Sequence, residues 1–269
     1  TCVRILRRYI DRLGYDTRFA IYDTEDQKTL MKEVCRKLNI DTKKTKERSL
    51  LAQISHAKDE LITPTELMQR ALTSSDYAKR KQAEVYREYQ EALHKNNALD
   101  FDDLIMKTVE LLQSDPEVKN YYQERFHYIM VDEYQDTNTA QFELIRLLAG
   151  KYQNLCVVGD DDQSIYKFRG ARPELMLNFP KDFENTRQVI LNRNYRCGEE
   201  IVQVAEDIIS YNTKRFEKKM QAREDAASMV EVRTFKDHYE ENKHIIYTIK
   251  EEMAKKTPLS QIAILYRTN

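Results

Sequence analysis

The stretch YIMVDEYQDTN, residues 128–138, decides the fold expected for this chain. Its first four residues, Tyr128 to Val131, form a short apolar run that is typical of a strand buried on both faces of a parallel sheet. In open α/β sheets, ligands bind beyond the carboxyl ends of the strands. Asp132 and Glu133 follow the run directly, so they are predicted to project into a ligand crevice.

Two adjacent carboxylates at a strand end can divide the work of phosphoryl transfer to water. That reaction needs a metal ion to neutralise phosphate charge and a group to orient the attacking water. Asp132 is the candidate for Mg²⁺, and Glu133 is the candidate for the water. The alternative is a solvated turn that caps the next helix, which the bare dipeptide favours. The longer string at residues 131–138 favours the catalytic interpretation.

A second stretch, LCVVGDDDQSIYKFRGA at residues 155–171, repeats the pattern of an apolar strand followed by acidic residues. Gly159 permits a sharp exit from the strand. Asp160, Asp161, Asp162 and Gln163 then follow at the expected crevice. A glutamine amide both donates and accepts hydrogen bonds, so Gln163 suits the sensing of a terminal phosphate and its attacking water.

Aromatic and cationic side chains alternate in the second half of this stretch. Tyr166, Phe168 and Arg169 suit single-stranded nucleic acid, with rings against bases and the guanidinium on phosphate. The alternative places Ile165 and Phe168 in the core and Tyr166 on the surface. The residues alone leave both interpretations open.

A third stretch, VILNRNYR at residues 189–196, again follows a strand-like run. Arg196 could give a bidentate contact to a γ-phosphate, which is the role of an arginine finger. Tyr195 could stack on an adenine ring. The alternative is a plain tyrosine and arginine on the surface.

In this order, the three stretches resemble the superfamily 1 DNA helicases of the PcrA/UvrD/Rep type. Residues 132–136 resemble the Walker B motif of that family, residues 159–171 its motif III, and residues 194–196 its motif IV. The segments LDFDDLI at 99–105 and AILYRTN at 263–269 also fit, and TCVRILRR at 1–8 is similar to the end of motif Ib. The resemblance covers essentially the whole chain.

The resemblance implies roles for residues at the nucleotide. Asp132 corresponds to the Mg²⁺ residue and Glu133 to the base that activates water. Gln163 corresponds to the γ-phosphate sensor that links ATP to DNA. Arg196 corresponds to the finger arginine, and Tyr195 to the residue that stacks on adenine. The implied cofactors are ATP and Mg²⁺.

The resemblance also implies contacts with single-stranded DNA and with junctions of single- and double-stranded DNA. Tyr166 and Phe168 fall where the family stacks bases, although the Phe168 position is often tryptophan. Arg169 falls at an arginine of the network that couples nucleotide to DNA. Arg267 and Asn269 resemble positions that contact the strand.

A phosphate-binding loop of the form G-x-x-x-x-G-K-[ST] is absent from these residues. Of the five glycines in the sequence, only Gly150 precedes a lysine, and Lys151 is followed by Tyr152. The sequence begins at Thr1, and the later motifs of the family are also missing. We therefore expect a fragment of a longer protein that hydrolyses ATP, and we expect the isolated chain to be inactive.

Composition agrees with a cytoplasmic protein of this kind. The formal net charge is −1 with 33% charged residues, so a DNA site must be a local groove rather than a wholly basic surface. Cys2, Cys35, Cys156 and Cys197 have no spacing typical of a zinc site or a disulfide framework. No apolar run is long enough to span a membrane, so no membrane partner is expected.

The expected fold class is α/β, with a partial RecA-like parallel-sheet motor domain, a helical insertion and the start of a second RecA-like domain. Residues 1–16 and 97–196 are assigned to motor domain 1A. Residues 17–96 are expected to be helical throughout and form subdomain 1B. Residues 197–269 form the first half of motor domain 2A.

Several elements are predicted individually. Strands are expected near 128–132, 155–159, 188–192, 229–234 and 261–267, and helices at 198–212 and 238–255. A helix from about 76 to 94 should bury a stripe of Tyr77, Val85, Tyr86, Tyr89 and Leu93. Phe101, Leu104, Ile105 and Leu112 should mark another buried face. Asp23 with Asp26, and Thr63 with Glu66, should cap helices.

Two classes of function compete at this point. The first is an ATP-dependent DNA helicase and translocase in repair or replication, with 3′→5′ polarity implied by the resemblance. The second is a catalytically inactive module of the same fold that binds DNA or protein. The helicase part of a helicase–nuclease is a further form of the first class. The presence of Asp132, Glu133, Gln163 and Arg196 together favours the first class.

Overall fold

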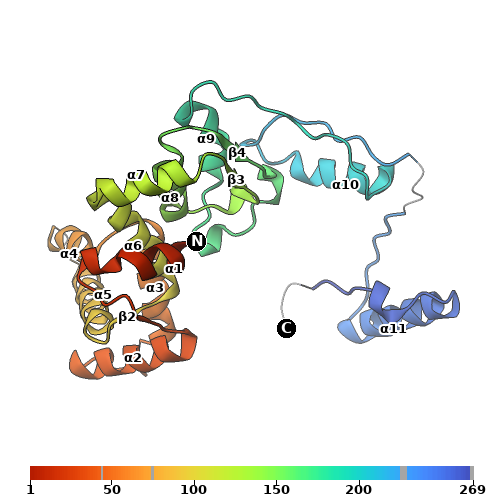
Figure 1. The fold of residues 1–269 in the computed structure, drawn as a ribbon. Coiled ribbons are helices and arrows are strands. Elements are labelled where there is room, and N and C mark those ends of the chain that lie inside the picture. The colour runs from red at the N-terminus through yellow and green to blue at the C-terminus, as the bar shows by residue number, and fades with distance from the viewer. Residues whose placement is uncertain (44, 74–75, 225–228, 267–269) are drawn as a thin grey trace. The chain divides into compact units, whose positions relative to one another are not determined.

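The computed structural model describes residues 1–43, 45–73, 76–224 and 229–266. The chain divides into two compact units, which are described separately. Unit 1 comprises Thr1–Ile190 and Thr213–Glu217, and unit 2 comprises Leu191–Asn212 and Lys218–Asn269. Figure 1 shows the order of the elements along the chain.

Helices make up most of unit 1. They are α1 (Cys2–Tyr9), α2 (Thr24–Lys37), α3 (Glu47–Asp59), α4 (Pro64–Leu72), α5 (Tyr77–Lys95), α6 (Phe101–Ser114), α7 (Pro116–Arg125), α8 (Thr139–Ala149) and α9 (Pro173–Asp182). A short 3-10 helix, Ile10–Leu13, extends α1 and ends at Gly14 with a φ of 81°.

Side-chain caps fix where the predicted helices begin. The Asp23 carboxylate accepts from the backbone of Asp26, and the Asp26 side chain accepts in return, at the start of α2. Thr63 and Glu66 form the same reciprocal box at the start of α4. Each box satisfies backbone N–H groups that have no partner within the helix. Both predicted caps are confirmed.

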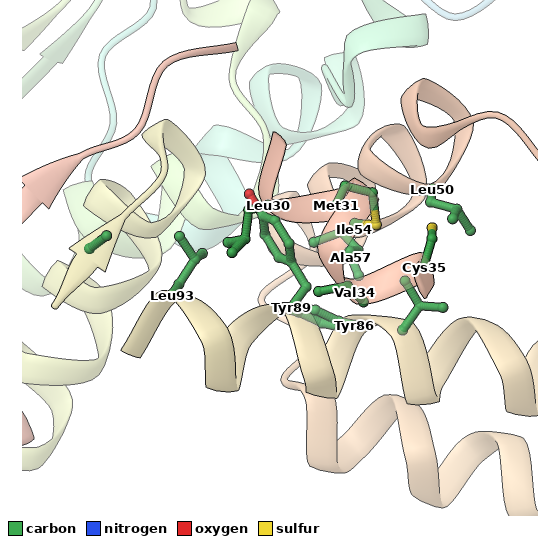
Figure 2. Packing of buried hydrophobic residues seen from close by; sticks show 12 residues of the cluster. Leu30, Met31, Val34, Cys35, Leu50, Ile54, Ala57, Tyr86, Tyr89 and Leu93 are labelled. Atoms are coloured by element: carbon green, nitrogen blue, oxygen red, sulfur yellow. The ribbon is translucent and has the colours of Figure 1, made fainter. Parts of the chain in front are cut away.

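The helices of the segment predicted to be an insertion have their own core between α2, α3 and α5. Figure 2 shows Tyr86, Tyr89 and Leu93 on one side of α5, in the same buried cluster as Met31 and Val34 of α2. All five side chains are buried, as the predicted stripe on α5 requires. Tyr77 was wrongly included in that stripe. It is 77% exposed because it occupies the first turn of α5, beyond the packed part of the helix.

A second core joins α1, α6, α7 and α8. Its buried side chains are Ile5, Leu6, Ile10, Tyr15, Phe19, Leu99, Leu111, Leu112, Val118, Tyr122 and Leu148. Leu112 confirms part of the predicted buried face of α6. Phe101 contradicts it, because this first residue of the helix is 57% exposed.

A buried ionic network ties α3 to α6. Lys58 Nζ lies 2.7 Å from Asp100 Oδ2 and 2.8 Å from Asp103 Oδ1, and all three residues are buried. The Tyr89 hydroxyl donates to Asp100, and the Gln90 amide donates to Asp103. Burial disfavours the charged lysine, but the carboxylates of Asp103 and Asp100 outweigh it and raise the pKa of Lys58.

Two small parallel sheets complete unit 1. Strand β1 (Ala20–Ile21) pairs with β2 (Ala98–Leu99), so residues 17–96 are not helical throughout as predicted. Strand β3 (Ile129–Val131) pairs with β4 (Leu155–Val157), with Ile129 opposite Leu155. These two strands were predicted. Their burial on both faces was not borne out, since Met130 is 78% exposed and Cys156 is also exposed. Alternate side chains lie on opposite faces, and one face of this two-stranded sheet is open.

Unit 2 contains α10 (Glu199–Ile209) and α11 (His238–Ala254), which confirm the two predicted helices. The strands predicted at 188–192, 229–234 and 261–267 are absent from the described residues of those ranges, and Arg267 lies outside them. Arg193 forms only an isolated parallel bridge to Gln221. A strand needs a neighbour to pair its backbone groups, and these apolar runs have none among the described residues. No described helix is both long and apolar enough to cross a membrane.

Candidate functional site

The two acidic stretches meet at the carboxyl ends of β3 and β4. Val158 N–H donates to the Val131 carbonyl at 2.8 Å, and Tyr134 N–H donates to the Val158 carbonyl at 2.9 Å. Asp132 and Glu133 stand between these two bonds, both exposed. The predicted position of the two carboxylates at a strand end is thus found in the structure.

Glu133 adopts a left-handed backbone conformation, with a φ of 50°. A residue other than glycine seldom takes this conformation, which stores conformational strain. Two bonds hold it: Glu133 N–H donates to Asp132 Oδ1 at 3.0 Å, and Gln135 Nε2 donates to Glu133 Oε2 at 2.7 Å. The turn therefore fixes the direction of the Glu133 carboxylate.

Gln135 joins the two stretches, and its role was missed in the sequence. Its side chain is 2% exposed. While Nε2 donates to Glu133, Oε1 accepts from Asp160 N–H at 3.0 Å. Its backbone carbonyl also accepts from the Ser164 hydroxyl at 3.4 Å. The only signal in the sequence was a polar residue within an otherwise recognisable motif.

Gly159 is needed because Gln135 passes so close to it. A Cβ at position 159 would lie 2.6 Å from Gln135 Oε1 and 3.2 Å from Met176 Sδ. Contacts below 3.0 Å are essentially not found for real side chains. Glycine at the exit of β4 therefore permits the bridge between the two stretches, and not only a sharp turn.

The acidic residues after β4 are partly neutralised by an arginine. Oxygens of Asp160, Asp161 and Asp162 lie within 4.8 Å of one another. Arg215 binds Asp162 through two bonds, of 2.8 and 2.7 Å, and the Asp162 carboxylate raises the pKa of this guanidinium. Gln163 Nε2 donates to Asp160 Oδ2 at 2.7 Å. The predicted sensor thus connects through Asp160 and Gln135 to Glu133.

Tyr166, Phe168 and Arg169 form one exposed cluster. The two ring centroids are 6.0 Å apart, and Arg169 Cζ lies 5.0 Å from the Tyr166 ring and 5.5 Å from the Phe168 ring. Phe168 is 78% exposed, and Ile165 is exposed as well, so the core interpretation of this segment is wrong. The structure brings together two rings and one cation, which suits stacking on bases.

The end of this loop is anchored on α3 and α8. Asn138 Nδ2 donates to Asp59 Oδ1 at 2.6 Å, and a Cβ at Gly170 would lie 2.7 Å from Asp59 Oδ2. Burial raises the pKa of Asp59 to about 7, with the carboxylates of Asp102 and Glu60 adding to the shift. The bond from Asn138 favours the charged form, and burial outweighs it.

We expect Asp59→Asn to remove a pH dependence of stability. The pKa of Asp59 is about 7 in the folded chain, against an ordinary aspartate value of 3.8. Its stabilising contribution is therefore complete at low pH and is lost as the pH rises toward 7. Between pH 4 and pH 8, the free energy of unfolding should fall by roughly 1–2 kcal/mol more in the unaltered chain than in the variant, after allowance for solvent screening. Urea titrations across this range measure the difference, and parallel curves would contradict the prediction.

Tyr195 and Arg196 belong to unit 2, where both are exposed. Asn194 Oδ1 accepts from the backbone N–H groups of Arg196 and Cys197, and this turn presents the two side chains. A pocket of about 420 Å³ is lined by Arg193, Tyr195, Arg223 and Glu224. Arg193 Cζ lies 5.2 Å from the Tyr195 ring. The predicted strand-contacting residues Arg267 and Asn269 lie outside the described residues.

The residues at the ends of β3 and β4 fit a magnesium ion chemically. Mg²⁺ prefers oxygen ligands and is usually held by one or two carboxylates together with phosphates. Asp132 offers an exposed carboxylate at the strand end, and only its Oδ1 is engaged by the Glu133 backbone in the bonds described.

The two acidic stretches thus lie at the ends of two parallel strands and are joined by the side chain of Gln135. Residues 1–184 match the UvrD/REP helicase N-terminal domain, and residues 189–269 match the UvrD-like helicase C-terminal domain. The chain belongs to the UvrD/REP helicase family. The resemblance drawn from the motifs is confirmed.

Its relatives include proteins named ATP-dependent DNA helicase PcrA. The chain is 44% identical over 269 residues to that of Bacillus subtilis (strain 168) and 43% identical over 268 residues to that of Staphylococcus aureus (strain Mu50). It is 41% identical over 268 residues to that of Staphylococcus epidermidis (strain RP62A). Each match covers 100% of this chain and 36% of the relative. The chain thus spans little more than a third of the length of these relatives.

Proposed function

We propose that this chain is the middle segment of an ATP-dependent DNA helicase, which couples ATP hydrolysis to movement along single-stranded DNA. The observation that carries the proposal is the Gln135 bridge, which joins the Glu133 carboxylate to the start of the second acidic stretch. Family membership supports it, because the relatives are named as ATP-dependent DNA helicases. Single strands and junctions of single- and double-stranded DNA are the proposed partners, the proposed location is the cytoplasm, and 3′→5′ is the proposed polarity.

At the nucleotide, Asp132 would hold Mg²⁺ through its exposed carboxylate. When bound, the ion would neutralise charge on the terminal phosphates of ATP. Glu133 is the proposed base. Its Oε2 is held by Gln135, which leaves Oε1 to accept a proton from the attacking water. The strained backbone of Glu133 keeps this oxygen in one direction before substrate arrives.

The coupling to DNA is proposed to run along the second stretch. Gln163 is bonded to Asp160, and the Asp160 backbone is bonded to Gln135. Only a short segment separates Gln163 from the cluster of Tyr166, Phe168 and Arg169. A change at the terminal phosphate could therefore alter the base-stacking cluster through one short turn. Arg196 as the finger and Tyr195 as the adenine-stacking residue are proposed from the family pattern.

Two substitutions should separate these roles in the full-length protein proposed here. Phe168→Ala should weaken binding of a single strand by roughly 1–3 kcal/mol, the range for loss of one base–aromatic stack. It should leave ATPase activity without DNA almost unchanged. Gln163→Ala should do the reverse, with near-normal strand binding but no stimulation of the ATPase by DNA.

Fluorescence anisotropy with a labelled oligonucleotide and steady-state ATPase assays would measure both effects. Tyr77→Ala is the matched control for Phe168→Ala, because Tyr77 is an equally exposed ring on α5, outside the cluster. Equal losses of affinity for the oligonucleotide in the two variants would contradict the stacking role of Phe168. Normal DNA stimulation in Gln163→Ala would remove that residue from the coupling path. An inactive DNA-binding module would bind strands in every assay and hydrolyse no ATP.

A further inference from the structure

We propose that Asp59, at the end of α3 in the helical insertion, is a positioning residue for the strand-binding cluster of Tyr166, Phe168 and Arg169. The inference rests on the proposed function for its consequence in DNA binding. Its structural part stands independently. Asp59 is distant in sequence from the cluster, and neither the motifs nor the family match gives it a role.

The contact between Asp59 and the loop is close and specific. Its Oδ1 accepts the 2.6 Å bond from Asn138, which orients the carboxylate. Its Oδ2 then lies against the backbone of Gly170, where a Cβ would approach to 2.7 Å. Gly170 has a φ of 84°, which a residue with a side chain rarely adopts. The carboxylate of Asp59 therefore packs directly against the Gly170 turn.

The carboxylate of Glu60, the residue that directly follows α3, holds the next part of the same loop. Glu60 Oε2 accepts from the Thr139 hydroxyl at 3.1 Å and from Arg172 Nη1 at 3.4 Å. The backbone N–H of Arg172 donates to the Thr137 carbonyl at 2.9 Å. Two consecutive acidic residues thus fasten the segment at Gly170 and Arg172 to α3 and to the start of α8.

The Gly170 turn is bonded directly to the cluster. Gly170 N–H donates to the Lys167 carbonyl at 3.1 Å, and Ala171 N–H donates to the Tyr166 carbonyl at 3.3 Å. A displacement of the turn would change the backbone that carries both rings and the guanidinium between them. Lys58, the residue before Asp59, forms ion pairs with Asp100 and Asp103. These ion pairs fix the end of α3, and with it Asp59, against α6.

Charge argues that Asp59 positions the loop and does not itself bind the strand. Above pH 7, where Asp59 is mostly charged, its carboxylate repels phosphates, so its removal would by charge alone strengthen binding of DNA. A loss of affinity on removing Asp59 therefore has to come from displacement of the loop. Loss of the charge and displacement of the loop would thus change the affinity for DNA in opposite directions, so the measured direction tells them apart.

The test uses the chain of residues 1–269 with a single tryptophan. The sequence contains no tryptophan, so Phe168→Trp places one reporter in the cluster. Asp59→Ala and Asp59→Ser, each in this background, remove the carboxylate that packs against Gly170. We expect a changed emission maximum, a changed degree of quenching by acrylamide and about fivefold weaker binding of an oligothymidine, a fraction of one full stack. Asp59→Asn keeps the shape and the acceptor for Asn138, so it should restore both readouts to within about twofold.

Glu91→Ala is the control, because Glu91 is an exposed acidic residue on α5 of the same insertion. It should change neither readout. Gly170→Ala should disturb the tryptophan by itself, and its effect should be smaller in the Asp59→Ala background, because part of the clash is then relieved.

The outcomes separate the two proposals. Unchanged quenching and unchanged affinity in both Asp59→Ala and Asp59→Ser, in chains that remain folded by circular dichroism, would overturn the positioning role. Strictly additive effects of the Asp59 and Gly170 variants would also overturn it. Failure of every variant, the Phe168→Trp reference included, to bind oligothymidine counts against the proposed DNA function, while the quenching results still decide whether Asp59 positions the loop.

Discussion

Glu133→Gln should lower the ATP turnover of the full-length protein at least ~10²-fold, the usual range for loss of a positioned general base. Binding of ATP should persist, because the substitution keeps the size of the side chain and leaves Asp132 in place. In the unaltered chain, Gln135 Nε2 donates a hydrogen bond of 2.7 Å to Glu133 Oε2. The amide oxygen of a glutamine at position 133 can accept the same bond after rotation of the amide. The turn should therefore keep its shape while losing the group that accepts the proton.

Binding of a fluorescent ATP analogue would measure the retained affinity for ATP, and steady-state ATPase assays would measure the loss of turnover. Glu143→Gln is a suitable control, since Glu143 lies on the neighbouring α8 and pairs with Arg146 at 2.7 Å, outside the strand ends. Its turnover should stay within about twofold of the unaltered protein. Near-normal turnover in Glu133→Gln would assign the base to another residue and weaken the interpretation of the whole 131–138 string.

Lys58→Ala should destabilise unit 1 by about 3–5 kcal/mol, the range for breaking a buried ion pair by removing one partner. Lys58 lies between the buried carboxylates of Asp100 and Asp103, at 2.7 and 2.8 Å. Without the ammonium group, burial and mutual repulsion act on both carboxylates with no cation to offset them. The urea midpoint should fall with little change in slope.

Two comparisons isolate the charge from the packing. Lys58→Met keeps most of the volume, so it should be nearly as destabilising if charge dominates. Lys28→Met removes an exposed partner of Glu25 on α2 and should cost less than about 1 kcal/mol. The combination of Lys58→Met with Asp100→Asn and Asp103→Asn should recover much of the loss. A change below about 1 kcal/mol in Lys58→Ala would show that the network contributes little to stability.

The local elements of the site were predictable from particular residues. The apolar runs before Asp132 and before Gly159 indicated β3 and β4, and the structure pairs them in parallel. Alternating rings and cations left an exposed cluster and a core segment both open, and the structure shows Tyr166, Phe168 and Arg169 as an exposed cluster. These signals are short-range, since they depend on strand periodicity and on which residue types follow one another.

The connections between these elements were not predictable in the same way. Gln135 bonds to both acidic stretches, Arg215 pairs with Asp162, and Asp59 meets Gly170. Apart from the bond between Gln135 and Glu133, each contact joins residues whose separation along the chain gives no sign that they touch. The prediction of strands at 188–192 and 229–234 was wrong for a related reason. An apolar run forms a strand only where a neighbouring strand pairs with its backbone groups.

The sequence by itself determined the helix caps at Asp23 and Thr63, the strands at the two acidic stretches and membership of the helicase family. All of these depend on local chemistry or on short motif strings that can be read along the chain. Only the tertiary structure decided that Lys58 is buried between two aspartates, that Gln135 bridges the stretches and that α3 braces the Gly170 turn. The physical reason is that burial and hydrogen-bond partners are properties of packed neighbours, and packing brings together residues that the chain order keeps apart.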